Sequence, residues 1–306
     1  MKAVIIINPN SGKRNKKIDT KRIESIFKEF QYEVTILFTH YQNHAKEIVQ
    51  SLDFVDLVVS VGGDGTFNEI MSGNFCRKER LLLAHIPSGT ANDLGAMYGY
   101  GRSFYKNLRL LLNGTIKKID ICTINDQPFT YVAALGKFTN VSYDTPRWMK
   151  KKFGYLAYLI EGIKELKIIP KLYSIEYEVN GKNYQGDYSF LFISNANQIG
   201  GIRNFYSDIK LDDNCFEVLF CSMTHYKDVV KSLCQLTKTD FSNIPGFQFY
   251  KTNHLKLTFQ NYLEKGFSID GEELKEKNKV FDIKIVNNVE ILIPNKNISK
   301  LFLEKE

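Results

Sequence analysis

The first third of the chain alternates between two patterns of hydrophobic residues, one typical of strands and one typical of helices. Short apolar or alternating runs predict strands, at residues 2–7, 34–38, 55–61 and 81–86. Apolar residues at helical spacing predict helices over residues 23–30 and 44–52. The third and fourth strands are joined by a helix-compatible segment. The order β-α-β-α-β-α-β predicts an α/β domain with a parallel sheet and helices on both faces.

From about residue 116 the pattern becomes β-rich. Strands are expected at residues 117–124, 129–135, 173–179, 182–186, 189–194, 215–221, 254–259 and 280–285. Asn180-Gly181 separates two of them, as in a hairpin. Many strands with few helices predict a second, β-sandwich-like domain.

One segment of the second domain departs from this pattern. Residues 148–167 combine apolar and aromatic side chains at helical spacing with lysines that include Lys150, Lys151 and Lys152. The segment is either a core helix with a solvated lysine face or a helix that touches a membrane surface.

Length, charge and cysteine usage narrow the classes of protein. A chain of 306 residues suits two domains, and its net charge of +7 favours anionic partners such as nucleotides or acidic lipid surfaces. The five cysteines have no C-x-x-C spacing and no secretory segment precedes them, so a reduced, cytoplasmic protein is expected. No apolar run is long enough to span a membrane. No zinc-finger spacing or aromatic RNA-binding cluster supports nucleic acid as a partner.

A glycine-rich loop after the third strand carries the strongest chemical signal. Residues 58–70 read as strand, tight loop and helix, with Gly62, Gly63 and Gly65 in the loop. Glycines let a backbone approach a ligand closely, and a helix N-terminus attracts phosphate. Asp64 adds a negative charge there, which calls for a divalent cation such as Mg²⁺. The alternative is an ordinary glycine-rich turn of a doubly wound sheet.

The other strand ends of the parallel sheet also carry polar residues. Ligands of such sheets bind at the carboxyl ends of the strands, which here are residues 8–13, Thr39, 62–66 and 87–93. Thr90 and Asp93 are ligand candidates in the last of these, although both residue types also cap helices.

Two acidic turns complete the candidate residues. Asp212 and Asp213 precede a strand, and they form either a solvated loop or a metal site with oxygen ligands. Asp270 and Glu272 flank Gly271, as suits a general base beside a polar helper, although an exposed β-turn has the same pattern.

Taken together, these motifs resemble the bacterial diacylglycerol kinase-like lipid kinases, whose catalytic domain is related to those of sphingosine kinases and NAD kinases. The matching segments span nearly the whole chain, at residues 8–12, 62–68, 88–94 and 269–272. The resemblance implies a nucleotide-binding α/β domain at residues 1–120, completed by residues 291–306. It also implies a β-rich lipid-substrate domain at residues 121–290, with the active site in a cleft between the two.

The resemblance also implies roles for individual residues. Asp270 would be the general base, Glu272 would hold the metal or the loop, and Asp64 and Asp93 would lie near catalytic Mg²⁺. ATP contacts would come from Asn10, Thr39, Gly62, Gly63, Asp64, Gly65, Thr66, Phe67, Asn68 and Thr90.

A second, structural Mg²⁺ is implied at the Asp212-Asp213 turn. Its ligands would be the Asp213 carboxylate and the carbonyls of Lys210 and Cys215. Asn214 stands where the family has glycine, and asparagine tolerates the left-handed backbone that this position requires.

The function expected from this resemblance is ATP- and Mg²⁺-dependent phosphorylation of a lipid hydroxyl, most directly that of diacylglycerol to give phosphatidic acid. The alternatives are an NAD kinase and a non-catalytic nucleotide- or lipid-binding protein. A lipid substrate predicts peripheral contact with the inner membrane leaflet, where Lys150, Lys151 and Lys152 would attract acidic lipid headgroups. The chain could also form a homodimer. Asp270→Asn is expected to abolish turnover while ATP affinity and melting temperature stay near those of the wild type.

Overall fold

The structure is a computed structural model, and the description below covers all residues except those named next. Outside the described residues lie 13–17, 90–91, 137–170, 197, 200–201, 204–208, 226–227, 229–243, 265, 271, 275–277 and 304–306. The predicted basic helix at residues 148–167 lies outside the described residues, as do Thr90 and Gly271.

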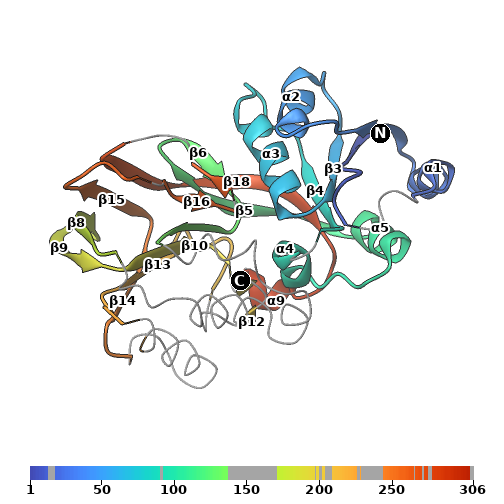
Figure 1. The fold of residues 1–306 in the computed structure, drawn as a ribbon. Helices are drawn as coiled ribbons and strands as arrows, with labels where there is room; N and C mark the ends of the chain where they lie inside the picture. Colours follow the sequence, from blue (N-terminus) through green and yellow to red (C-terminus); the bar gives the residue numbers. More distant parts are fainter. Residues whose placement is uncertain are drawn as a thin grey trace.

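The N-terminal part of the chain is an α/β lobe, as the sequence predicts (Figure 1). Its parallel strands have the order β2-β1-β3-β4, with β1 at Lys2–Ile7, β2 at Glu33–Phe38, β3 at Leu57–Gly62 and β4 at Leu83–Pro87. The helices are α1 (Thr20–Glu29), α2 (His44–Ser51), α3 (Asp64–Phe75), α4 (Asp93–Met97) and α5 (Phe104–Leu112).

Strand β3 shows why this sheet is covered on both faces. All six of its residues are buried, as expected for a continuous apolar run in a parallel sheet. Successive side chains point to opposite faces, so Val58 joins the cluster of Phe67 and Ile70 on α3, while Val59 joins that of Ile23 on α1. The two apolar clusters hold helices against both faces of the sheet.

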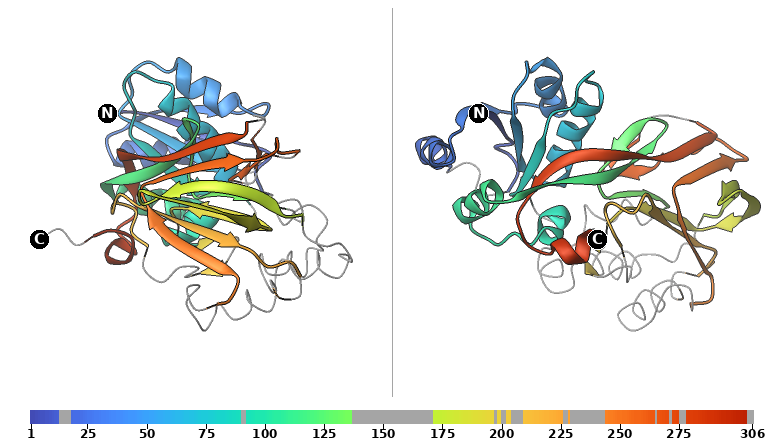
Figure 2. Two further views of the ribbon diagram at one scale, coloured as in Figure 1. Left: turned by 90° about the vertical axis from the view of Figure 1, so that its left-hand side faces the viewer. Right: turned by 180° about the vertical axis from the view of Figure 1, so that it is seen from behind.

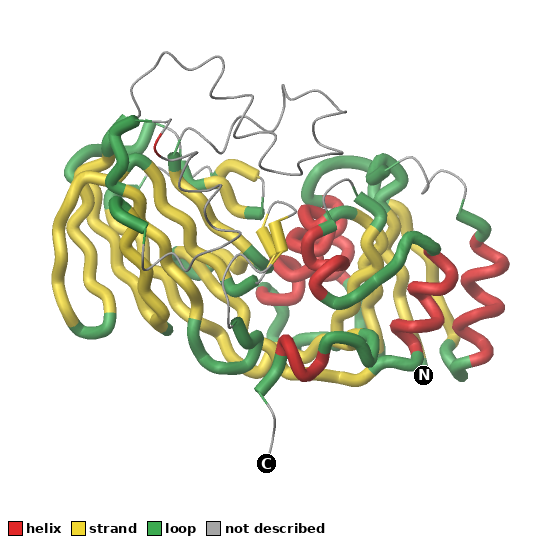
Figure 3. The backbone as a smooth tube through the Cα atoms, turned by 90° about the horizontal axis from the view of Figure 1, so that it is seen from below, coloured by secondary structure: helices red, strands yellow, loops and turns green. Residues whose placement is uncertain are grey.

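Among the described residues, the β-rich lobe contains strands of two large sheets with a shared core, and one separate two-stranded sheet (Figure 3). Its strands are β6 (Gln127–Phe129), β7 (Val132–Leu135), β8 (Tyr173–Val179), β9 (Lys182–Tyr188), β10 (Phe190–Ser194), β11 (Gln198–Ile199), β12 (Ile202–Arg203), β13 (Phe216–Cys221), β14 (Phe247–Thr252), β15 (His254–Phe259), β16 (Ser268–Ile269) and β17 (Glu272–Glu273). Aromatic side chains from both sheets, among them Phe216, Phe220, Phe267 and Phe281, fill the space between them. This arrangement agrees with the expected sandwich-like lobe.

Several strand boundaries predicted from the sequence are wrong, such as the strand expected at residues 280–285, which extends to Ile293, but the break inside another strand is the most informative. The expected strand at residues 129–135 divides into β6 and β7, which belong to different sheets. The chain leaves one sheet and enters the other at Thr130 and Tyr131, whose backbone N–H groups donate to the Asp270 carboxylate instead of to a neighbouring strand. A side-chain acceptor from a distant turn therefore ends a run that looks continuous in sequence.

The long strand β18 (Val280–Ile293) links the two lobes. Its first half pairs with β15, its end pairs in parallel with β4 through Ile291 and Leu292, and β5 (Thr115–Ile124) runs antiparallel along most of its length. Figure 2 shows the two strands crossing the molecule together from one lobe to the other. Hydrogen-bonded strands therefore continue between the lobes, and the short helix α9 (Ile298–Leu301) follows at the chain's end.

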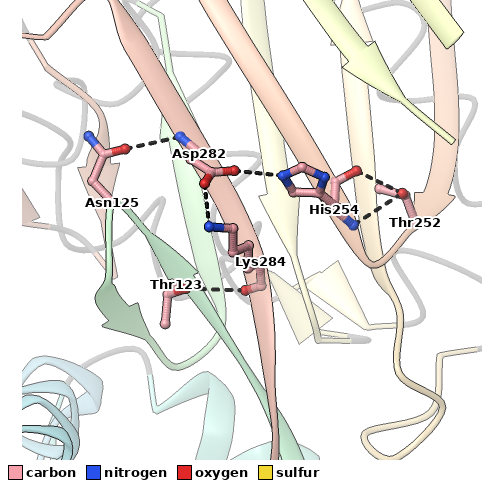
Figure 4. A network of polar contacts seen from close by, with 6 residues as sticks. All are labelled: Thr123, Asn125, Thr252, His254, Asp282 and Lys284. Carbon is pink, nitrogen blue, oxygen red and sulfur yellow. Dashed lines mark hydrogen bonds and ion pairs between the residues drawn. The ribbon is translucent and has the colours of Figure 1, made fainter. Parts of the chain in front are cut away.

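Polar contacts also hold the first residues of β18 to neighbouring elements of the β-rich lobe (Figure 4). Asp282 accepts from Lys284 Nζ at 2.5 Å and contacts His254 Nε2 at 2.6 Å, and its own N–H donates to Asn125 Oδ1 at 3.0 Å. These bonds join β18 to β15 and to the turn after β5. Among the helices that the structure describes, none is long and apolar enough to cross a bilayer.

Candidate active site

Three loops meet at the carboxyl end of the parallel sheet. The strand order reverses direction between β1 and β3, and such a switch point is where open α/β sheets bind ligands. The loop after β1 reaches the loop after β3 through Asn8, whose N–H donates to Val61 O at 2.9 Å and whose Nδ2 donates to Thr66 Oγ1 at 3.1 Å. The loop after β4 joins them, because Ser88 N donates to Gly62 O at 2.7 Å.

Glycines make this close approach of backbones feasible. A Cβ on Gly12, which has a φ of +69°, would lie 2.1 Å from Ser88 O, and a Cβ on Gly89 would lie 2.5 Å from Gly63 Cα. Both distances are too short for any larger residue without backbone movement. The three loops thus form one packed surface at the N-terminus of α3.

Asp64 is the first residue of α3 and is 6% exposed. Its Oδ2 accepts the N–H of Asp93 at 3.0 Å, which ties the start of α3 to the start of α4. Its Oδ1 has no hydrogen-bond partner among the described residues. Burial and the nearby charges of Asp93 and Asp270 raise the pKa of the Asp64 carboxyl to about 7.

His85 lies beside Asp64 and was not identified from the sequence. Its Nε2 is 4.0 Å from Asp64 Oδ1, and its ring packs on Phe67 with centroids 5.0 Å apart. Burial lowers the pKa of His85 to about 3, so the imidazole is neutral and offers Asp64 no balancing charge. The available signal was a histidine inside an otherwise apolar strand, opposite Ser60 in the register of β3 and β4.

Asp270 faces this region from the β-rich lobe, in the turn between β16 and β17. Its Oδ2 accepts from Thr130 N at 2.6 Å and Thr130 Oγ1 at 2.7 Å, and its Oδ1 accepts from Tyr131 N at 3.1 Å and Val132 N at 3.0 Å. Burial raises the pKa of Asp270, and these four donors oppose that shift because they stabilise the carboxylate. Asp270 has a φ of +48°, so the turn aims the carboxylate at β7 through a left-handed backbone.

The lobes also touch through Glu272. Its Oε2 accepts from Gln42 Nε2 at 3.3 Å, and its Oε1 lies 3.7 Å from where a Gly65 Cβ would stand. The Asp-Gly-Glu turn of one lobe therefore sits against the glycine loop of the other. Tertiary structure brings together Asp64, Asp93, Asp270 and Glu272, the four residues proposed from the sequence to be catalytic.

The proposed nucleotide residues occupy different environments. Asn10 is exposed and Thr39 is buried at the end of β2. Phe67 packs its ring into the core, so only its backbone is placed to meet a ligand, and Asn68 is 8% exposed. Gly62, Gly63, Gly65 and Thr66 lie where the three loops meet.

The proposed structural metal site, by contrast, has its carboxylate already occupied. Asp213 Oδ2 is 2.7 Å from Lys251 Nζ, and Asp213 Oδ1 accepts the N–H of Cys215 at 3.1 Å. Asn214 has the expected left-handed backbone, with a φ of +57°. The turn geometry agrees with the expectation, but these donors do not fit a bound Mg²⁺ because an ammonium group occupies the ligand oxygen.

The catalytic Mg²⁺ fits better at Asp64. An unpartnered carboxylate oxygen, buried beside a helix N-terminus and near two other acids, is the type of ligand that Mg²⁺ prefers. Among the described residues, no group of three or more His, Cys, Asp or Glu side chains is arranged as a complete metal site. Mg²⁺ usually takes one or two carboxylates and completes its shell with phosphate oxygens and water.

Comparisons with known proteins agree with this geometry. Residues 2–124 match the diacylglycerol kinase catalytic domain. The chain is 28% identical to a diacylglycerol kinase of Bacillus subtilis over 274 residues, which cover 89% of each chain. It is 27% identical to one of Staphylococcus aureus, covering 89% of this chain and 86% of the relative.

Solved structures share the fold. The crystal structure of a diacylglycerol kinase from Bacillus anthracis has a TM-score of 0.77 at 21% identity, covering 97% of this chain and 98% of that one. Another structure from the same organism has a TM-score of 0.82 at 22% identity, covering 97% and 96%. The fold and these matches define the protein as a kinase. More particularly, the chain is similar to the bacterial diacylglycerol kinase-like lipid kinases, through the catalytic-domain match at residues 2–124 and through relatives aligned over most of its length.

Proposed function

We propose that this protein transfers the γ-phosphoryl group of ATP to the hydroxyl of a lipid, with diacylglycerol as acceptor and phosphatidic acid as product. The observation that carries the proposal is that the turn holding Asp270 and Glu272 lies against the glycine loop that begins α3, where Glu272 contacts Gln42 and approaches Gly65. In a phosphoryl transfer, one carboxylate near the donor phosphates and one near the acceptor hydroxyl satisfy the charge and proton requirements.

The α/β lobe would hold the donor. Residues 1–120, completed by 291–306, bind ATP in this proposal, and the backbone of the three packed loops lies against its phosphates at the N-terminus of α3. Asp64 and Asp93 would hold Mg²⁺, which neutralises the charge of the phosphates when it is bound. Thr90 lies outside the described residues, and we propose that it contacts the nucleotide.

The β-rich lobe, residues 121–290, would hold the lipid and present its hydroxyl to Asp270. All four acceptor positions of this carboxylate are occupied, three of them by fixed backbone N–H groups. The Thr130 hydroxyl is the one donor that can rotate away. The acceptor hydroxyl would take its place on Oδ2 and pass its proton there as the oxygen–phosphorus bond forms and ADP leaves.

A lipid acceptor also requires contact with a bilayer. We propose that the protein is cytoplasmic and binds the inner leaflet peripherally. The contact would be made by the lysines near residue 150, in a segment that lies outside the described residues. Each basic residue near an anionic surface contributes about 1 kcal/mol. One chain carries every proposed site residue, so the chemistry is the same in a monomer and in a homodimer.

The test is incubation of the purified protein with radiolabelled ATP, Mg²⁺ and separate acceptors: diacylglycerol, other lipid alcohols, and NAD. Label in phosphatidic acid is the expected result. Label in NAD phosphate with none in lipid would assign the protein to the NAD kinases instead, and no label in any acceptor would favour a binding protein without turnover.

Asp270→Asn tests the proposed base. Turnover should fall on the order of 10³-fold while ATP affinity, measured by titration, stays within a few-fold of the wild type. The melting temperature of this variant is no longer expected to stay near that of the wild type. The new amide nitrogen would face N–H groups that donate to a carboxylate oxygen in the wild type.

Asp126→Asn is the matched control. Asp126 also has a left-handed backbone, with a φ of +65°, but it is exposed in the turn between β5 and β6. This variant should keep wild-type turnover. If Asp270→Asn also keeps most of its lipid kinase activity, Asp270 is not the base.

A further inference from the structure

A second group of acids surrounds the Asp213 turn, far in sequence from the glycine loop. We use the name Asp213 cluster for Asp120, Asp213 and Glu217. Asp213 and Glu217 both lie within 4.0 Å of Lys251 Nζ, and Asp120 accepts the N–H of Asn214, the residue that follows Asp213. Acids gathered in this way are stabilised by a nearby positive charge or by keeping a proton.

Lys251 supplies that charge from a fixed position. It lies on β14 directly opposite Glu217 on β13, so the pairing of the two strands delivers its side chain to the cluster. Its Nζ is 2.7 Å from Asp213 Oδ2 and 4.0 Å from Glu217 Oε1. Strand register, and not a chance surface contact, therefore sets this ion pair.

The turn itself is held by the chain's own groups. Asp120 Oδ2 accepts the N–H of Asn214 at 2.6 Å, Asp213 Oδ1 accepts the N–H of Cys215, and Asn287 Nδ2 donates to Asn214 Oδ1 at 2.9 Å. These three bonds fix the left-handed residue and both of its neighbours. A metal ion is not needed to impose this backbone conformation.

We infer that the Lys251 ammonium occupies the place of a divalent cation at the Asp213 cluster, so that the β-rich lobe folds without a structural metal ion. An ammonium 2.7 Å from the only carboxylate among the proposed ligands both repels a divalent cation and takes its coordination position. The inference concerns the stability of the fold and stands whether or not the proposed lipid kinase activity is correct.

The experiment measures Mn²⁺ binding by electron paramagnetic resonance and melting temperature in EDTA or in millimolar Mg²⁺. Both are measured without nucleotide in an Asp64→Asn background, which removes one of the two carboxylates proposed to hold the catalytic Mg²⁺, the other being Asp93. The Asp64→Asn protein should bind no Mn²⁺ and should melt at the same temperature in EDTA and in Mg²⁺.

Lys251→Met is the decisive substitution, because it keeps the length of the side chain and removes its charge. Added to Asp64→Asn, it should lower the melting temperature in EDTA by about 3–6 °C. It should also create one Mn²⁺ site, and Mg²⁺ should restore part of the lost stability. Adding Asp213→Asn should abolish that Mn²⁺ site, and Lys256→Met, at an exposed lysine of β15, should change neither reading.

Two results would overturn the inference. One is Mn²⁺ binding, or a fall in melting temperature with EDTA, in the Asp64→Asn protein that is lost when Asp213→Asn is added, since a metal would then sit at the turn despite Lys251. The other is a Lys251→Met protein that gains no response to divalent ions. If that variant does not fold, Lys251→Gln removes the same charge and keeps a polar side chain. The measurements on the Asp64→Asn protein alone still decide whether the lobe folds without a metal ion.

Discussion

Two groups of buried carboxylates in this protein differ in what balances their charge. Asp64, Asp93 and Asp270 meet between the lobes, and the described basic side chain within 4 Å of Asp64 is His85, which is neutral. The Asp213 cluster has the Lys251 ammonium at 2.7 Å. Both groups contain a carboxylate oxygen without a hydrogen-bond partner among the described residues, on Asp64 and on Glu217, so the difference between them is the cation. The group without a charged basic side chain is prepared for an external cation, whereas the Asp213 cluster already contains one.

The difference also separates function from stability. Burying like charges together is unfavourable, and a protein keeps such an arrangement where its chemistry requires it. The unbalanced negative charge at Asp64 is explained if a metal ion and phosphates bind there. The charges at Asp213 help to hold a turn, and their balance comes from strand pairing.

Asp64→Asn should have the largest effect and should act in opposite directions on activity and stability. We expect kinase turnover to fall on the order of 10²–10³-fold, because a ligand for the donor's cation is lost. In EDTA at pH 8 the variant should melt at a higher temperature than the wild type, because a desolvated charge beside two other acids is removed. Calorimetry and a lipid kinase assay check the two effects, and a lower melting temperature would contradict this account of Asp64.

Glu217→Gln should change the pH dependence of stability. Burial raises the pKa of Glu217 to about 8, although Lys251 opposes the shift. The folded protein thus keeps a proton that the unfolded chain releases near pH 4.5, so the free energy of unfolding falls as the pH rises from about 4.5 to 8 and levels off above 8. This residue contributes on the order of 4 kcal/mol to that fall, which the variant should lack.

Urea unfolding between pH 5 and 9 measures this contribution. Repeating it with Mg²⁺ separates the contribution of Glu217 from that of Asp64. Asp64 contributes a similar fall that ends near pH 7, and bound Mg²⁺ should reduce the Asp64 part and leave the Glu217 part unchanged. A Glu217→Gln protein with the wild-type pH dependence would show that Glu217 is ionised in the fold.

The smallest effect is expected at Asn214, where the backbone and not the charge is tested. Asn214→Gly should change the free energy of unfolding by no more than about 0.5 kcal/mol, since glycine adopts the left-handed conformation freely. Asn214→Ala should cost about 1–2 kcal/mol. Both variants lose the hydrogen bond from Asn287, so the difference between their free energies of unfolding measures the cost of the left-handed backbone alone. Equal stability of the two would mean that the turn does not need a left-handed residue.

Most of the architecture could be predicted from local pattern. Strands β1, β8 and β15 begin and end at the predicted residues, because apolar runs and alternation report directly on burial. The Gly62–Gly65 motif predicted a strand, a tight loop and a helix, and all three appear, but the loop is shorter than expected because Gly62 ends β3 and Gly65 lies in the first turn of α3. The missed elements were those defined by distant partners, such as the break at Thr130 and the strand β14, which provides Lys251.

What the sequence determined by itself was the identity of the chemical groups: the glycine loop, the acids, and the family that their motifs resemble. These are local properties of neighbouring residues. Tertiary structure decided which groups meet and what surrounds them. Asp270 became buried under four hydrogen bonds from residues about 140 positions earlier, and Asp213 gained an ion pair with Lys251 of β14. Burial and strand register bring these partners together, and neither can be read from the residues on either side of an acid.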